Sequence, residues 1–178
     1  MTESFAWFPS LEKRGSATAL VDREQSISYD ALYQSVNRVI AGLLNAADSL
    51  DEERVAFLYP ASFDYAALII GVVAAGGIAV PLSVHASADE LSHCLSEAGV
   101  KRLLLPDALR TPALDAVCSQ LGVAQMSVEA LLDADRPTTL PLKAEQGALI
   151  VFTSGTTGKP KAVVHTVESV SAMITSLI

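Results

Sequence analysis

A nine-residue segment, from Thr153 to Lys161, has the composition of a phosphate-binding loop. It contains four hydroxyl side chains, two glycines and two lysines. Backbone N–H groups of glycine-rich loops form anion-binding concavities, hydroxyl groups donate to phosphate oxygens, and lysine ammonium groups neutralise their charge. The segment follows the apolar run from Ala148 to Phe152, which predicts a buried strand. Because ligands bind beyond the carboxyl ends of parallel strands, the segment predicts a polyphosphate site.

The spacing of the glycines excludes two common phosphate-binding motifs. A Walker A loop has four residues between its glycines and a Ser or Thr after the lysine. Here two residues separate Gly155 from Gly158, and a proline follows Lys159. The dinucleotide fingerprint Gly-x-Gly-x-x-Gly is also absent from the sequence.

The whole string, Thr-Ser-Gly-Thr-Thr-Gly-Lys-Pro-Lys, resembles the signature loop of the adenylate-forming superfamily nearly letter for letter. This superfamily includes acyl-CoA synthetases, luciferases and the adenylation domains of peptide synthetases. A polar turn after a strand is the alternative interpretation, but turn composition alone rarely supplies two lysines with four hydroxyl groups. Other segments are similar to core elements of the same superfamily, namely 26–32, 54–58, 74–82 and 88–91. The resemblance covers most of the chain, from about Ala19 onward.

The resemblance implies a set of ATP-binding residues. The positions that match the loop around the β- and γ-phosphates are Thr153, Ser154, Gly155, Thr156, Thr157, Gly158 and Lys161. Lys159 and His165 are candidates for further contacts. In the superfamily, the adenine- and ribose-binding residues and the catalytic lysine come later in the chain. We therefore expect no catalytic residue and no metal ligand in this segment.

The reaction that the resemblance implies has two steps. A small-molecule carboxylic acid attacks the α-phosphate of ATP, which is accompanied by Mg²⁺, and gives an acyl-adenylate and pyrophosphate. The thiol of coenzyme A then takes the acyl group. The resemblance thus predicts an AMP-forming acid–thiol ligase of the acyl-CoA synthetase type, acting in acid or fatty acid metabolism.

Two positions depart from the superfamily pattern. Ala162 stands where a glycine is usual, and Val167 stands where a histidine is usual. His165 lies two positions before Val167, as in some malonyl-CoA-synthetase-like members, and a structural role for a histidine at a strand end is an equal alternative. The acyl substrate is not defined by the sequence.

Complete members of the superfamily are far longer than this chain. Residues 1–178 are therefore expected to be the N-terminal portion of an AMP-binding domain, cut just after the phosphate loop. We expect this portion to be inactive alone, to pack against the remainder of its own chain, and to be prone to self-association. Two alternatives stay open: an adenylation domain that loads a carrier protein, and a non-catalytic phosphate-binding or interaction module.

The elements that would position the loop alternate between helix and strand. Helices are expected from residue 29, from residue 62 or 64, over 88–98, and from 112 to a stop at Gly122. Strands are expected at 54–59, 78–80, 102–105, 123–126 and 148–152, and a surface connection at 133–146. The strands are continuous apolar runs, which is typical of burial on both faces. The pattern predicts an α/β fold with a parallel sheet flanked by helices on both faces.

The composition narrows the classes of partner and location. Apolar residues make up 51% of the chain and the formal net charge is -8, so nucleic acid is not an expected partner. The uncharged run from Tyr65 to Leu82 reaches the lower limit for a spanning helix, but Gly76, Gly77 and Pro81 interrupt it, so no transmembrane segment is expected. The two cysteines have no metal-binding spacing, and no secretory signal is evident, so a cytoplasmic location is expected.

Overall fold

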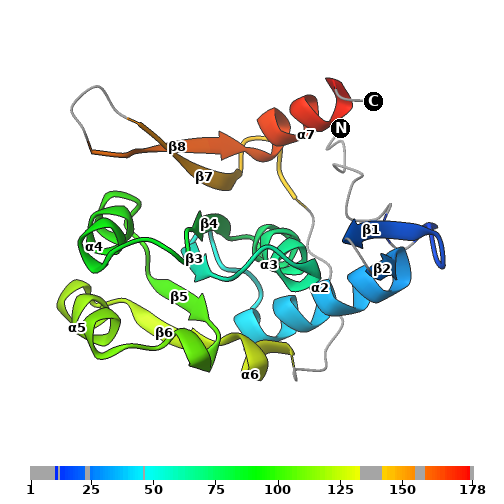
Figure 1. The fold of residues 1–178 in the computed structure, drawn as a ribbon. Coiled ribbons are helices and arrows are strands. Elements are labelled where there is room, and N and C mark those ends of the chain that lie inside the picture. The colour runs from blue at the N-terminus through cyan, green and yellow to red at the C-terminus, as the bar shows by residue number, and fades with distance from the viewer. Residues whose placement is uncertain are drawn as a thin grey trace.

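A six-stranded sheet forms the centre of the chain. The computed structural model describes residues 11, 13–22, 25–45, 47–132, 142–154 and 159–176. The strands are β3 (Arg54–Leu58), β4 (Ile78–Leu82), β5 (Arg102–Leu105), β6 (Ala124–Ser127), β7 (Gly147–Thr153) and β8 (Lys161–Thr166). Their order in the sheet is β6-β5-β3-β4-β7-β8 (Figure 1). All neighbouring pairs are parallel except β7 and β8, which are antiparallel.

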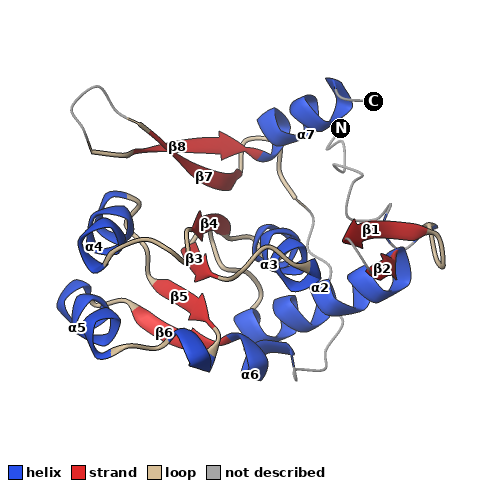
Figure 2. Cartoon of the chain, viewed as in Figure 1, coloured by secondary structure: helices blue, strands red, loops and turns tan. Residues whose placement is uncertain are grey.

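Helices cover both faces of the parallel strands. One face carries α2 (Tyr29–Leu44), α3 (Phe63–Ala74) and α6 (Val128–Leu132), and the other carries α4 (Ala88–Glu97) and α5 (Pro112–Leu121) (Figure 2). Consecutive residues of β3 alternate between the two cores, since Phe57 packs with α2 and α3 whereas Leu58 packs with α4 and α5. The predicted α/β architecture with helices on both faces is confirmed.

The remaining elements are a hairpin, a short 3₁₀ helix and a C-terminal helix. The strands β1 (Thr18–Asp22) and β2 (Gln25–Ser28) form a separate antiparallel hairpin that precedes α2. A short 3₁₀ helix, η1 (Asp107–Leu109), follows β5, and α7 (Val167–Ser176) follows β8. The expected surface connection at 133–146 lies outside the described residues up to residue 141.

Helix caps in the sequence confirm the predicted starts of the helices. Ser28, Ser62 and Thr111 each accept a hydrogen bond from a backbone N–H in the first turn of α2, α3 and α5. At α4 the Ser87 hydroxyl accepts from the Glu90 N–H, and the Glu90 carboxylate accepts from the Ser87 N–H, which is a full capping box. The bonds from Ser87 hold the pKa of Glu90 below its usual value.

Two expectations need correction. The sheet is mixed rather than wholly parallel, because the chain turns back after β7 and adds β8 as an antiparallel edge strand. The strand β4 also extends two residues further than 78–80, through Pro81 to Leu82. Proline lacks an N–H donor, but its carbonyl can still accept a hydrogen bond, so the strand continues beside β3.

The uncharged run from Tyr65 to Leu82 is a helix followed by a strand. Helix α3 ends at Ala74, and Gly76 has a positive φ of 83° that turns the chain into β4. A Cβ at Gly76 would also collide with the Ser49 hydroxyl. In the described part of the chain, no helix is long and apolar enough to cross a membrane.

Charged side chains fix the amino ends of the strands. Arg102 makes two bonds to the Glu53 carboxylate, at 2.6 and 2.9 Å, and donates a third, of 2.8 Å, to the Leu43 carbonyl at the end of α2. The carboxylate of Glu52 accepts a 2.6 Å bond from the Gly147 N–H at the start of β7. These bonds connect the end of α2, the segment before β3 and the first residues of β5 and β7 at one edge of the sheet.

Helices α2 and α3 approach closely at Gly71. A Cβ placed on Gly71 would lie 2.5 Å from Cγ1 and 2.7 Å from Cβ of Val39, which is fully buried. A rotation of the Val39 side chain could move its Cγ atoms away from the added methyl group. Its Cβ is fixed to the backbone, so relieving that contact requires a shift of the helix.

A Gly71→Ala variant tests this packing. In an exposed helix the change would stabilise by about 1 kcal/mol, because alanine is the better helix former. Here we expect a loss of about 1–3 kcal/mol in the free energy of unfolding, because the added methyl group overpacks the α2–α3 contact. Urea unfolding of the two proteins measures the difference. A variant as stable as the parent, or more stable, would show that the two helices are not in contact at this position.

Candidate phosphate-binding site

The predicted phosphate loop connects β7 to β8 at the carboxyl edge of the sheet. Strand β7 ends at Thr153 and β8 begins at Lys161, and these two residues are paired across the hairpin. Residues 155–158, which include Gly155, Thr156, Thr157 and Gly158, lie outside the described part of the chain.

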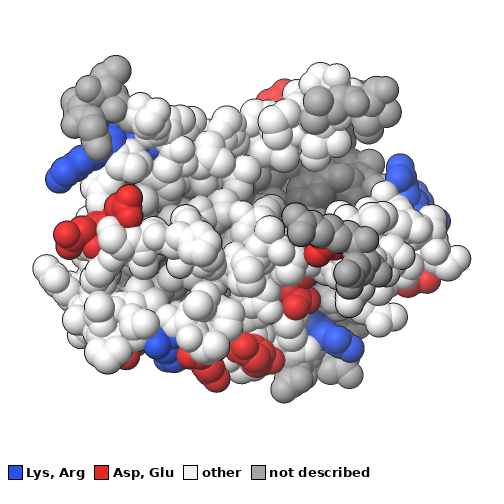
Figure 3. Space-filling model, in the orientation of Figure 1, with Lys and Arg blue, Asp and Glu red and all other residues white. Residues whose placement is uncertain are grey.

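The described ends of the loop present polar groups on an exposed surface. Directly paired residues of neighbouring strands point to the same face, so the Thr153 hydroxyl and the Lys161 ammonium group lie on one side of the hairpin. Thr153, Ser154, Lys159 and Lys161 are all exposed. In the space-filling view, basic side chains lie beside the outer end of the hairpin (Figure 3). A donor and a cation on one exposed face suit an anionic ligand.

His165 lies at the other end of β8. It is paired with Leu149 and is partly buried. It lies four positions after Lys161, which corresponds to about 13 Å along an extended strand. That separation argues against a direct contact between His165 and a phosphate held at the loop. The neighbouring Val167, which replaces the usual histidine, is fully buried at the start of α7.

One contact at the loop was not predicted from the sequence. The Nε2 atom of His93, on α4, lies 2.8 Å from the carbonyl oxygen of Pro160, between the two lysines of the loop. Because a carbonyl can only accept, the histidine nitrogen donates. His93 is partly buried. The two residues are 67 positions apart, so no local pattern relates them.

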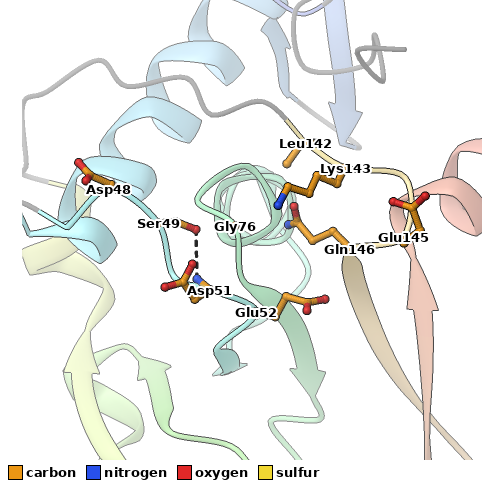
Figure 4. A pocket seen from close by; sticks show the side chains of 9 residues that line it. All are labelled: Asp48, Ser49, Asp51, Glu52, Gly76, Leu142, Lys143, Glu145 and Gln146. Carbon is orange, nitrogen blue, oxygen red and sulfur yellow. Dashed lines mark hydrogen bonds between the residues drawn. The ribbon is translucent and has the colours of Figure 1, made fainter. Parts of the chain in front are cut away.

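A hollow of about 580 Å³ lies at the edge of the sheet opposite the loop (Figure 4). It is formed by the segments that lead into the strands, and its lining residues are Asp48, Ser49, Asp51, Glu52, Gly76, Leu142, Lys143, Glu145 and Gln146. Four carboxylates and one ammonium group face this space. An ATP triphosphate would be repelled here, so the hollow is a poor candidate for the nucleotide site.

Both cysteines lie on helices of the same face of the sheet. Cys94 and Cys118 are buried in α4 and α5, and burial raises the pKa of both thiols. Among the residues that the structure describes, no group of three or more His, Cys, Asp or Glu side chains could hold a metal ion.

The chain combines a mostly parallel α/β sheet with a hydroxyl- and lysine-bearing loop at the carboxyl ends of its strands, where open α/β sheets bind their ligands. Residues 7–178 match the AMP-binding enzyme family, and the chain belongs to this family.

Curated relatives include enzymes of two kinds. The chain is 32% identical over 174 residues to malonate–CoA ligase ACSF3, mitochondrial, from Xenopus laevis, covering 90% of this chain and 30% of that protein. It is 31% identical over 160 residues to long-chain-fatty-acid–CoA ligase FadD13 from Mycobacterium tuberculosis, covering 84% of this chain and 31% of that protein. It is 32% identical over 150 residues to cyclosporin synthetase simA from Tolypocladium inflatum, covering 83% of this chain and 1% of that protein. The chain thus spans about a third of the length of its CoA ligase relatives.

Solved structures share the fold. The N-terminal domain of FACL13 from M. tuberculosis aligns with a TM-score of 0.75 at 27% identity, covering 93% of this chain and 44% of that one. The N-terminal subdomain of Klebsiella oxytoca NpsA aligns with a TM-score of 0.77 at 22% identity, covering 93% of this chain and 42% of that one. The likeness to these N-terminal units confirms the predicted architecture.

Proposed function

We propose that this chain supplies the phosphate-binding part of an ATP-dependent enzyme that activates a carboxylic acid. The observation that carries the proposal is the position of the 153–161 loop. It resembles the superfamily's signature loop, follows the inner strand β7 at the carboxyl edge, and begins and ends on the exposed pair Thr153 and Lys161. Membership of the AMP-binding enzyme family and the named activities of the relatives support the same function.

The proposed reaction begins with an encounter between two anions. A carboxylate oxygen attacks the α-phosphorus of ATP, the α–β phosphoanhydride bond breaks, and acyl-adenylate and pyrophosphate form. Cationic and N–H groups around the β- and γ-phosphates reduce the repulsion and stabilise the departing pyrophosphate. In the proposed site, these groups come from Thr153, Ser154, Gly155, Thr156, Thr157, Gly158 and Lys161. Lys159 adds positive charge from the surface.

The described residues at the loop supply no carboxylate that could hold Mg²⁺. Magnesium is often bound through substrate phosphates and water with few protein ligands. In the proposed function a Mg²⁺ ion therefore arrives on ATP and neutralises charge on its phosphates, and any protein ligand comes from outside the described residues.

The acyl acceptor proposed for the second step is the thiol of coenzyme A, which displaces AMP from the acyl-adenylate. The names of ACSF3 and FadD13 favour coenzyme A, whereas the cyclosporin synthetase relative favours transfer to a carrier protein. We prefer coenzyme A because the alignments with the two CoA ligases are about as similar as the alignment with simA and extend over more residues, 174 and 160 against 150.

The apolar surface of the hairpin supports a proposal about the domain. Val163 and Val164 are consecutive on β8, so they point to opposite faces, and they are 38% and 49% exposed. Met173 and Ile174 on α7 are exposed as well. Because the chain spans about a third of its CoA ligase relatives, we propose that the rest of an AMP-binding domain covers both faces of β8 and this side of α7.

Pyrophosphate release tests the proposed activity. The complete polypeptide that contains these 178 residues is incubated with ATP, Mg²⁺ and single acids, including malonate, a long-chain fatty acid and ferulate, with and without coenzyme A. We expect release that depends on one acid and falls roughly 100-fold or more in a Thr156→Ala, Lys161→Ala variant, because donors to the developing charge are lost.

Lys143→Ala is the matched control for pyrophosphate release, because it removes a lysine from the acidic hollow at the opposite edge. It should leave release unchanged. A folded protein that releases pyrophosphate equally well without the two loop side chains would contradict the proposed site. A requirement for coenzyme A in multiple turnovers would favour it over a carrier protein.

Self-association of the isolated 178-residue chain tests the domain proposal. The uncovered edge strand and apolar side chains should drive the chain to associate, and a Val164→Lys, Met173→Lys variant should remain monomeric, because charge on an edge opposes pairing. Analytical ultracentrifugation over a concentration series measures this. Gln120→Lys, on the exposed side of α5, is the control and should associate like the parent. A parent chain that is monomeric throughout would argue that nothing needs to cover this surface.

A further inference from the structure

His93 is held firmly at the side of the hairpin. Its helix, α4, starts at a full capping box and packs Leu91, Cys94 and Leu95 into the core beneath the sheet. Phe152 and Ala162, at the ends of β7 and β8, pack against the same core. Figure 1 shows α4 beside the outer end of the β7–β8 hairpin. The imidazole therefore reaches the loop from a rigid element.

The carbonyl of Pro160, which accepts the hydrogen bond from His93, lies at the end of the loop. Pro160 has no N–H group, so its carbonyl is the polar backbone group of that residue. The bond from His93 Nε2 to this carbonyl fixes the peptide unit that leads directly into Lys161. Lys161 is in turn paired with Thr153. One side chain thereby restrains the end of the loop from which the proposed phosphate-binding lysine projects.

We propose that His93 is a positioning residue for ATP, which holds the exit of the phosphate loop through the Pro160 carbonyl. This inference rests on the proposed function of the loop. His93 does not touch the phosphates in this account; it reduces the freedom of the segment that does. Its loss should raise the KM for ATP and leave the KM for the acid unchanged, because the proposed function assigns only contacts with the ATP phosphates to this loop.

The substitutions separate positioning from general packing. His93→Ala removes the donor without weakening the helix, because alanine is the best helix former. His93→Gln keeps an N–H donor at about the same distance from the backbone and should restore the contact. His85→Ala is the control, because His85 is an exposed histidine that precedes the same helix.

Two measurements on the complete polypeptide test the proposal. The first is trypsin cleavage after Lys161, which needs no substrate and reports how often the hairpin end opens. The second is the KM for ATP and for the acid in pyrophosphate release. For His93→Ala we expect cleavage about two- to tenfold faster and a KM for ATP about two- to tenfold higher, as follows from the loss of one hydrogen bond. His93→Gln and His85→Ala should behave like the parent in both measurements.

The outcomes also distinguish this inference from the proposed function. Unchanged cleavage in His93→Ala, a glutamine variant as impaired as the alanine variant, or an equal rise in both KM values would overturn the positioning role. A parent protein that releases no pyrophosphate with any acid would overturn the proposed function instead. In that case, faster cleavage in His93→Ala together with the parent's cleavage rate in His93→Gln would still establish that His93 holds the loop.

Discussion

The burial of β3 and β4 on both faces is the constraint on which the rest of the structure depends. Ala56 and Phe57, adjacent in β3, are both fully buried, each in a different core. Two covered faces require crossover helices on both sides, and such crossovers leave the strands parallel. Parallel strands bring their carboxyl ends to one edge, where the chain leaving β7 carries Thr153 and the residues after it. The location of the proposed phosphate site is therefore a consequence of the hydrophobic core.

The two edges of the sheet differ in charge. At the amino edge, carboxylates serve structure: Glu53 pairs with Arg102 and Glu52 accepts from the Gly147 N–H. The hollow at this edge is acidic because Asp48, Asp51, Glu52 and Glu145 line it. At the carboxyl edge, Lys159 and Lys161 lie on the exposed hairpin end. A chain with a formal net charge of -8 thus keeps local positive charge at the place where a polyphosphate is proposed to bind.

Local chemistry made most of the fold predictable, and non-local contacts explain what was missed. Capping residues such as Ser87 and Thr111 act within one turn, so the helix starts could be predicted from the sequence alone. The edge strand β8 could not, because its antiparallel pairing depends on a partner strand, β7, and not on its own residue pattern. The contact between His93 and Pro160 joins residues 67 positions apart and has no sequence pattern. The phosphate-binding roles of the loop residues rest on their resemblance to the signature loop, and they stay a prediction.

Hydrogen–deuterium exchange of the complete polypeptide, with and without ATP and Mg²⁺, tests the central claim most directly. Backbone N–H groups that hold phosphate oxygens exchange more slowly when ATP is bound. The account predicts slower exchange at the amides of residues 153–159 and 161–162, with no change at residues 48–52 and 142–147, which border the acidic hollow. Protection confined to the hollow, or no protection of the loop at saturating ATP, would contradict the account.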